Sequence, residues 1–389
     1  MVPTPLPYPT RRGANLERAR DHNRRLVLGE LSTGRTLGRA ELARRSSLST
    51  QAVSNIIAEL ERDGLLEPCG AARGRRGQPA MQYRISPGGG HALGFEVRPG
   101  AVFAQLLDLA GATVWSRRVA LARADPATVA ALLPRLRDEA WAARHAARPR
   151  TLGAGVVMPG PFGRTALSGE ATDLPGWAEV EAGPVLERAL ALPVAVENDA
   201  NAAAMAERLR DPSLRSFAAL YFGTGLGLGI VEDGRLVTGA RGNAGEIGQI
   251  PVPGPHGPVA LERVLSRAAV GAHLARHGTS APDMAALARL HEAGDPALAR
   301  WIRDAAPALG HALALVENLL DPACTLLCGA MPEPILRALL AAAPPPRSVA
   351  RGPDGREEPV RIGTCSPMAA ARGAAALVLA RAFTPALAA

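Results

Sequence analysis

The sequence predicts an α+β winged helix-turn-helix domain, followed by an α/β domain made of two similar halves with a cleft between them. Three observations predict this class. The apolar residues of Arg39–Leu66 recur at helical spacing with one break. A basic turn flanked by short strands follows directly. Beyond residue 90, strands alternate with helices, and the order strand, turn, strand occurs twice.

The segment Arg39–Leu66 predicts two short helices joined by a tight turn. Its inward-facing residues are expected to be Leu42, Ala43, Leu48, Val53, Ile57 and Leu60. Ser49 is suited to cap the second helix, because its hydroxyl can accept from the free N–H groups of the first turn. Gly64 then ends that helix in a conformation that glycine adopts at little cost.

The outer face of the second helix suits DNA recognition. With the apolar residues turned inward, short hydrogen-bonding side chains face outward, and such groups read base edges in the major groove. The basic loop and a strand over Met81–Ile85 are typical of a wing, whose arginines reach phosphates or the minor groove. The candidate DNA contacts are Ser49, Thr50, Gln51, Ser54, Asn55, Arg73, Arg75 and Arg76. The plainer alternative is a polar-faced helix pair in a larger helical domain, but the wing argues against it.

Positive charge is concentrated in the same region. The 389-residue chain has a net charge of +8, and its first 90 residues, with 15 arginines and eight acidic residues, carry +7 of it. An excess of this kind marks the part of a chain that meets a polyanion. The predicted partner is therefore operator DNA.

The remaining composition excludes several classes of protein. The four cysteines form no CxxC pair and no disulfide framework, which favours thiols in a reducing cytoplasm. Residues 1–14 lack the apolar core of a signal peptide and are predicted to be disordered. Because no apolar run reaches about 18 residues, no membrane span is predicted.

Taken in order, the DNA-binding domain is predicted over residues 15–88 and the second domain over 91–389. Asn15–Leu31 is expected to be the first helix, and the glycine-rich Ser86–Gly90 a flexible joint. Strands are predicted at Ala92–Val97, Val102–Asp108, Thr113–Leu121, Leu152–Val157, Val194–Val196, Phe217–Tyr221, Gly227–Val231, Arg235–Thr238, Cys324–Cys328 and Val360–Gly363. Helices are predicted at Pro126–His145, Val180–Leu190, Ala200–Leu209, 261–275, 281–291, 296–319 and Ala369–Ala382.

Three motifs of the second domain carry polar chemistry, although each alone has a plainer explanation. Gly223–Gly229 lets backbone N–H groups approach a phosphate, or is simply a glycine-rich turn. Glu197–Asn201 sets a carboxylate beside an amide that could bind vicinal hydroxyls, or caps a helix. Arg241–Gly257 presents Glu246 on a glycine-bracketed turn, where an isolated glutamate is ordinarily solvated.

In this order the motifs resemble the ROK family of repressors and sugar kinases, and the resemblance covers nearly the whole chain. It implies a winged helix of the repressor branch and then an actin/hexokinase-like domain of two lobes. The shared motifs are His22-Asn23, Gly74–Pro79, Pro159–Pro161, Asp173–Trp177, Glu197–Asn201, Gly223–Gly229, Asn243–Gly248, Asp321-Pro322 and Ala371–Ala376. Together they are far more specific than any single motif.

Departures from the family pattern imply that the chain is not an enzyme. Family kinases hold nucleotide phosphates on a glycine pair, where this chain has Arg98-Pro99. Proline lacks an N–H, and the arginine side chain obstructs close backbone approach. Family members bind zinc through a cysteine cluster, and Pro251, Pro253 and Pro258 stand at those positions here. The resemblance therefore implies no catalytic residue, no metal and no cofactor.

The resemblance also implies a homodimer, or a dimer of dimers, that binds a palindromic operator and a sugar or sugar phosphate. The hydroxyls of that ligand are expected to bind Asn198, Asp199, Glu246, Gln249 and Glu262. Two alternatives stay open. One is a DNA-binding protein whose ligand site has decayed, because Gln249 replaces a family histidine. The other is an active sugar kinase with an added DNA-binding domain.

Overall fold

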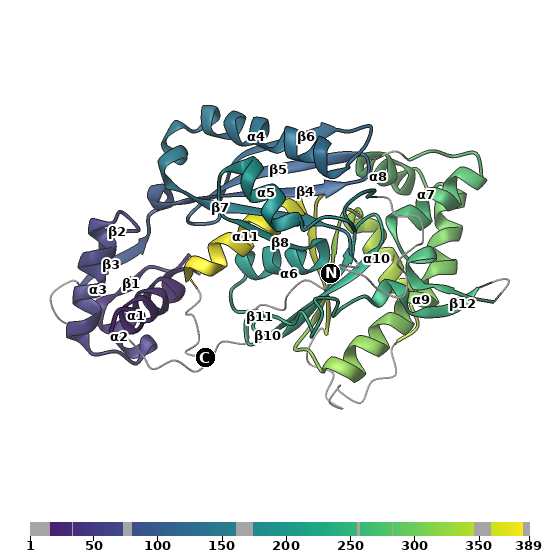
Figure 1. Cartoon of the computed structure of the whole chain (residues 1–389). Coiled ribbons are helices and arrows are strands. Elements are labelled where there is room, and N and C mark those ends of the chain that lie inside the picture. Colours follow the sequence, from purple (N-terminus) through teal and green to yellow (C-terminus); the bar gives the residue numbers. More distant parts are fainter. Residues whose placement is uncertain are drawn as a thin grey trace.

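The computed structural model describes residues 16–32, 34–72, 80–160, 174–254, 257–281, 283–345 and 359–383 (Figure 1). Its N-terminal part contains α1 (Leu16–Leu31), β1 (Leu37–Gly38), α2 (Arg39–Ser46), α3 (Thr50–Arg62), β2 (Leu66–Ala72) and β3 (Ala80–Ile85). The strands pair antiparallel in the order β1-β3-β2. The predicted winged helix-turn-helix is therefore confirmed. The predicted disordered residues 1–14 and the motif Gly74–Pro79 lie outside the described residues.

The local sequence sets both ends of α3. The Ser49 hydroxyl accepts a hydrogen bond from the Ala52 N–H at 3.2 Å, so the predicted cap is confirmed. Gly64 follows the helix with a φ of +72°, which residues with a side chain rarely adopt. Between these ends the side chains of Val53, Ile57 and Leu60 are fully buried.

Ion pairs orient α3 against α1. Arg20 and Arg24 contact the Glu59 carboxylate at N–O distances of 2.6 and 3.2 Å, and Arg24 also pairs with Asp63. The hydrogen bond from Arg20 lowers the pKa of Glu59. Because these pairs lie at the surface, they direct the helix more than they stabilise the chain.

The second domain is built from two lobes. Lobe I contains β4 (His91–Arg98), β5 (Ala101–Asp108), β6 (Thr113–Ala120), α4 (Pro126–Ala143), β7 (Thr151–Met158), α5 (Ala182–Leu190) and β8 (Val194–Asn198). Lobe II contains β9 (Phe217–Phe222), β10 (Leu226–Glu232), β11 (Arg235–Leu236), α7 (Arg267–Arg276), α8 (Met284–Glu292), α9 (Pro296–Leu320), β14 (Thr325–Gly329), α10 (Glu333–Ala342) and β15 (Val360–Cys365). Two further helices, α6 (Asp199–Arg210) and α11 (Ala369–Phe383), lie between the lobes.

The two lobes share one sheet topology. The sheet of lobe I has the order β6-β5-β4-β7-β8, and that of lobe II has the order β11-β10-β9-β14-β15. In each sheet the first three strands pair antiparallel, and the third, fourth and fifth pair parallel. The predicted duplicated α/β fold is therefore confirmed.

Helices α6 and α11 form the middle layers of the domain. Helix α11 packs on β4 and β7 of lobe I, α6 packs on β9 and β10 of lobe II, and the two helices pack on each other. Figure 1 shows α11 in yellow, running out from between the sheets toward the winged helix. Helices α4 and α5 cover the other face of the lobe I sheet, and α9 and α10 cover the other face of the lobe II sheet.

Glycines make this packing possible. A methyl group on Gly373 of α11 would lie 1.8 Å from the Ala202 carbonyl oxygen of α6. Methyl groups on Gly94 and Gly155 of the lobe I sheet would each lie 2.0 Å from a backbone oxygen of α11. Because only backbone stands at these points, no side-chain rotation can make room.

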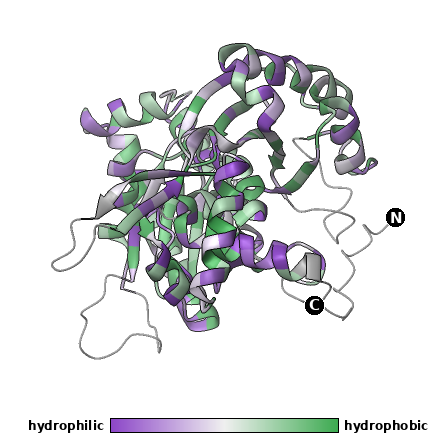
Figure 2. Cartoon of the chain, turned by 90° about the vertical axis from the view of Figure 1, so that its left-hand side faces the viewer, coloured by the Kyte–Doolittle hydropathy of each residue, from purple (hydrophilic) through white to green (hydrophobic). Residues whose placement is uncertain are grey.

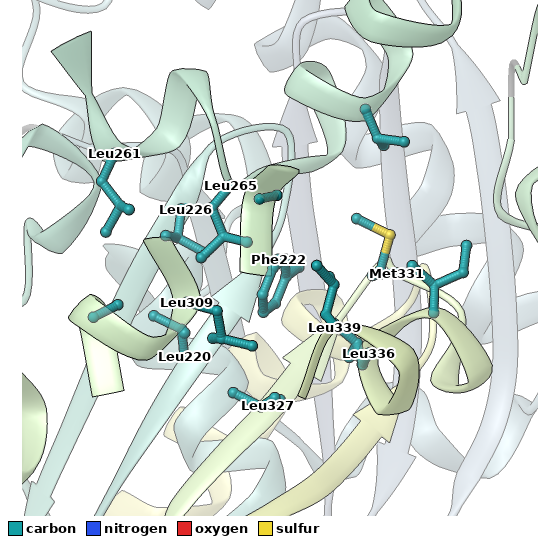
Figure 3. Close-up of a cluster of buried hydrophobic side chains, with 14 of the residues drawn as sticks. Leu220, Phe222, Leu226, Leu261, Leu265, Leu309, Leu327, Met331, Leu336 and Leu339 are labelled. Carbon is teal, nitrogen blue, oxygen red and sulfur yellow. The ribbon is translucent and has the colours of Figure 1, made fainter. Parts of the chain in front are cut away.

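Lobe II has the largest hydrophobic core in the described part of the chain. Figure 3 shows its centre around Phe222 of β9, with Leu309 of α9 and Leu339 of α10 packed against the sheet. Helix α10 is not among the predicted elements. Its first turn contains Pro334, and proline normally indicates a break, although a first helical turn tolerates it.

The prediction of a flexible joint at Ser86–Gly90 is wrong. The Ser86 N–H donates to the Leu65 carbonyl of the winged helix at 2.9 Å, and the Pro87 carbonyl accepts from Leu109 of lobe I at 3.2 Å. Gly89 is buried, and a methyl group there would lie 2.5 Å from the Gly64 carbonyl oxygen. The glycines serve close packing here, so the segment is a tight junction.

One hydrophobic core joins the winged helix to the second domain. Its members from α1 are Val27, Leu28 and Leu31, and its members from α11 are Ala375, Val378, Leu379 and Phe383. At the same junction the Arg150 guanidinium donates to the carbonyls of Asp63 and Gly89, at 3.4 Å each. The winged helix is therefore docked on lobe I and α11.

Surface helices are amphipathic, as Figure 2 shows by the alternation of hydrophilic and hydrophobic residues along their ribbons. Among the described residues, no helix has the length and apolar character that crossing a membrane requires. All four cysteines are free thiols.

The contact between α6 and α11 predicts the effect of one methyl group. Gly373→Ala should lower the free energy of unfolding by roughly 3 kcal/mol or more, because two backbones must separate. Gly271→Ala on α7 is the control, since nothing lies within 4 Å of the added methyl. It should stabilise the chain by about 0.5–1 kcal/mol through helix propensity. Urea unfolding measures both, and equal effects would contradict the account of this contact.

Candidate DNA interface and ligand site

The predicted recognition residues lie on the accessible face of α3. Ser49, Thr50, Gln51 and Asn55 are exposed, and Ser54 is half-buried. The Ser54 hydroxyl donates to the Thr50 backbone carbonyl at 2.9 Å, and the side-chain amide of Gln51 donates to Oδ1 of Asn55 at 3.2 Å. The Gln51 and Asn55 side chains are thus held side by side, with further donors and acceptors available for base edges.

A hollow of about 750 Å³ adjoins this face. It is lined by Leu37, Gly38, Arg39, Ala40, Glu41, Thr50, Ala80, Met81 and Gln82. Arg39 is exposed, and its guanidinium lies 5.1 Å from the centre of the Tyr83 ring. The first residues of α2 and α3 border the hollow, and helix N-termini favour anions. Arg39 and Gln82 are therefore candidate contacts that the sequence analysis missed, because their place beside α3 depends on how β3 packs.

The predicted wing arginines, Arg73, Arg75 and Arg76, lie outside the described residues. The strands on either side are in place, since β2 and β3 pair antiparallel from Leu66 with Ile85 to Ala72 with Ala80. Two antiparallel strands that follow a recognition helix directly are the strands that flank a wing.

The five predicted ligand residues meet between the lobes. Asn198 ends β8 and caps α6, and Asp199 is the first residue of α6. The other three come from loops of lobe II, with Gln249 in the 3-10 turn η3 (Ile247–Gln249) and Glu262 in η4 (Leu261–Arg263). The Gln249 amide donates to the Glu262 carboxylate at 2.9 Å. All five side chains are half-buried, so each keeps an accessible part.

Two glycines allow these side chains to converge. A methyl group on Gly160 would lie 2.4 Å from a Glu246 carboxylate oxygen and 2.9 Å from the Asn198 amide nitrogen. A methyl group on Gly225 would lie 2.4 Å from a Glu262 carboxylate oxygen. Each glycine therefore belongs to the site through the room it leaves, which no side-chain pattern can indicate.

Burial raises the pKa of two carboxyl groups of the site, Asp199 and Glu246. Burial and the nearby Glu96 carboxylate raise the pKa of Asp199 to about 7, against the opposing effect of Arg98. Burial and Glu262 raise the pKa of Glu246. Near neutral pH the Asp199 carboxyl can therefore accept from, and when protonated donate to, the hydroxyls of a polar ligand.

Arg98 occupies the place of the expected phosphate-binding glycines. It ends β4 before the two-residue turn Pro99–Gly100, and its Nε and Nη2 donate to the Glu96 carboxylate at 2.5 and 2.8 Å. The guanidinium also lies 4.2 Å from the centre of the Phe103 ring. Burial lowers the pKa of Arg98, but Glu96 more than offsets this, so the side chain stays charged.

The segment in which family members bind zinc folds as a hairpin of β12 (Pro251–Gly254) and β13 (Gly257–Ala260). Pro253 pairs with Pro258 across it, so these two positions carry side chains without a metal donor. Among the described residues, no group of three or more His, Cys, Asp or Glu side chains has the geometry of a metal site. The residues present do not fit a zinc ion.

Comparison with known proteins agrees with the division seen in the structure. The profile of the ROK family matches residues 103–381, and that of the MarR family matches residues 23–77. The chain is 24% identical to the xylose repressor of Caldicellulosiruptor bescii over 235 residues, which are 59% of this chain and 58% of that repressor.

Solved structures share the fold. A ROK family transcriptional regulator, a homologue of the Escherichia coli MLC protein, has a TM-score of 0.69 and 24% identity, over 95% of this chain and 98% of its own. The ROK hexokinase of Thermus thermophilus has a TM-score of 0.55 and 28% identity, over 73% of this chain and 97% of its own.

The raised pKa of Asp199 predicts a pH dependence of stability. Between pH values of about 4 and 7 the folded chain holds a proton at Asp199 that the unfolded chain has lost, so stability falls as the pH rises. Asp199→Asn removes this titration. The stability of the variant relative to the parent should therefore increase by roughly 1–2 kcal/mol from pH 5 to pH 8, after allowance for partial exposure.

The control for that experiment is Asp138→Asn, whose side chain is exposed on α4. Urea unfolding at the two pH values measures both variants. A difference between Asp199→Asn and the parent that does not change with pH would show that this carboxyl is solvated as in the unfolded chain.

Proposed function

The chain belongs to the ROK family, and on this premise we propose that it is a sequence-specific transcriptional regulator, a repressor of carbohydrate uptake or catabolism genes whose operator binding responds to a sugar. The observation that carries the proposal is the polar face of α3. Its exposed hydrogen-bonding side chains stand on a winged helix that is docked on a two-lobed domain. Exposed side chains of this hydrogen-bonding composition suit the base edges of the major groove.

The ligand is proposed to bind through Asn198, Asp199, Glu246, Gln249 and Glu262. Carboxylates and amides that converge from two sides match the many hydroxyls of a sugar, since each can accept or donate in a fixed direction. A relative with 24% identity is a xylose repressor, so D-xylose is the first sugar to test. Calorimetry against a panel of sugars and sugar phosphates separates this proposal from a decayed site, for which no member of the panel would bind.

Phosphoryl transfer is not part of the proposed function. Kinase catalysis consists largely of holding phosphates in place, and Arg98 and Pro99 remove the backbone approach that would do so. The alternative of an active kinase is kept because the family includes a hexokinase with 28% identity. Release of ADP from ATP with any sugar of the panel, lost in Asp199→Asn, would establish that alternative.

The regulator is proposed to act as a homodimer on a palindromic operator. A twofold operator mirrors a twofold protein, and half-sites separated by whole helical turns fix the distance between the two α3 helices. A ligand that bridges the lobes favours one lobe arrangement by its differential affinity. Because the winged helix is docked on lobe I and α11, a lobe movement would change that distance.

Truncation on α3 tests the DNA interface. Gln51→Ala or Asn55→Ala should weaken binding to a duplex selected from random DNA by the full-length chain, by roughly 1–3 kcal/mol, and should relax the base preference. Arg303→Ala on the exposed face of α9 is the control and should have no effect. Fluorescence anisotropy measures all three. Unchanged affinity in both α3 variants would mean that DNA binds elsewhere.

Removal of one proposed ligand contact tests the coupling between sugar binding and DNA binding. Asp199→Ala should leave the affinity of the ligand-free chain for the selected duplex unchanged, because Asp199 belongs to α6 and not to the winged helix. The same variant should lose the effect of the sugar on that affinity, which is about 5- to 150-fold for typical coupling. A full response in Asp199→Ala would place the ligand site elsewhere.

A further inference from the structure

Arg98 joins four separate parts of the chain with one side chain. Its guanidinium pairs with Glu96 of β4 and stacks on Phe103 of β5, both in lobe I. Its Nη2 also donates to the Pro367 carbonyl oxygen at 2.9 Å and lies 3.4 Å from the Tyr221 hydroxyl of β9 in lobe II. An arginine can do this because its planar guanidinium presents several donors in fixed directions.

This cluster cannot rearrange at little cost. Glu96 is fully buried and Arg98 is 14% exposed. The Tyr221 hydroxyl donates to the same Glu96 carboxylate at 3.2 Å. A buried charge that loses its partner is strongly destabilising, so Arg98 and Glu96 move together or not at all. The contact of Arg98 with the Pro367 carbonyl is therefore held by a rigid base.

Pro367 lies two residues before the start of α11 at Ala369, and the last turns of α11 pack into the core of the winged helix. The helix has 15 residues and is therefore about 22 Å long. At its far end Val378, Leu379 and Phe383 share a core with α1, where a methyl group on Gly29 would lie 3.0 Å from the Phe383 carbonyl oxygen. A displacement at the first turn of a packed helix is carried to its last turn.

The start of α11 also lies next to the ligand residues. A methyl group on Gly223 would lie 2.7 Å from the Tyr221 ring and 3.4 Å from a carboxylate oxygen of Asp199, so these two side chains flank the same glycine. Tyr221 in turn contacts Arg98 and Glu96. A ligand that binds Asp199 therefore changes the electrostatic surroundings of Arg98.

We propose that Arg98 is a positioning residue that transmits the state of the sugar site to the winged helix, through its hydrogen bond to Pro367 and the rigid helix α11. This proposal rests on the proposed function and adds the route of regulation. The residue that obstructs phosphate binding thereby gives the chain a contact between its lobes that needs no nucleotide.

The test compares two conservative variants of the full-length chain. Arg98→Lys keeps a cation beside Glu96. Because lysine is shorter and has one ammonium group, it cannot hydrogen-bond both the Glu96 carboxylate and the Pro367 carbonyl. Arg118→Lys is the matched control, because Arg118 also stacks on Phe103, at 5.7 Å, and is exposed on β6. The double variant Glu96→Gln/Arg98→Met removes both buried charges, so it leaves no unpaired carboxylate in the interior. It replaces Arg98→Lys in the test if that variant does not fold.

Two measurements are made on each variant, namely hydrogen exchange by mass spectrometry and affinity for the selected duplex. Arg98→Lys and the double variant should exchange at least about tenfold faster over α1 and the last two turns of α11, with α8 and α9 of lobe II unchanged. Their affinity for the duplex should fall at least about 5-fold, the lower limit of typical coupling, because the spacing of the winged helices is no longer fixed. Arg118→Lys should match the parent.

The proposal would be overturned by unchanged exchange over α1, or by equal acceleration in α1, α8 and α9, which is the pattern of general destabilisation. Its failure is distinct from failure of the proposed function. If the parent chain selects no duplex, the regulatory function is wrong. If the parent binds a duplex and Arg98→Lys behaves like Arg118→Lys, only the role of Arg98 is wrong.

Discussion

The packing of α6 against α11 is the constraint on which the rest of the structure depends. The two backbones touch at Gly373 and Ala202, and most neighbouring residues of both helices are alanines. One end of α6 carries Asn198 and Asp199 of the proposed ligand site, and one end of α11 lies in the core of the winged helix. Since close-packed interiors deform little, the two sites share one frame.

Charge explains why the same fold serves a regulator here. The proposed ligand residues are mostly acidic, and a nearby cation, Arg98, is paired with Glu96. The cluster thus suits hydroxyl groups, whereas a triphosphate would meet a proline and an occupied guanidinium in place of free backbone N–H groups. Arg98 uses its position at the end of β4 for another contact, a hydrogen bond to the Pro367 carbonyl oxygen.

Local chemistry made much of the fold predictable. The Ser49 cap, the left-handed Gly64 and the repeated strand-turn-strand order all depend on residues close in sequence. The tight junction at Ser86–Gly90 was not predictable, because the sequence does not distinguish a glycine that allows close packing from one that allows flexibility. The five ligand residues required the family resemblance. Glu96 and Tyr221 escaped notice, since a strand pattern does not tell which buried polar groups meet across lobes.

The central claim, that a sugar site and a DNA site are coupled through this frame, has one direct measurement. Calorimetry gives the affinity of the sugar panel, D-xylose included, for the free chain and for the chain saturated with its selected duplex. If a sugar changes the affinity of the chain for the duplex by a certain factor, the duplex must change the affinity for that sugar by the same factor. For typical coupling this factor is about 5- to 150-fold. Equal affinities in the two titrations, or no binding by any sugar, would contradict the account.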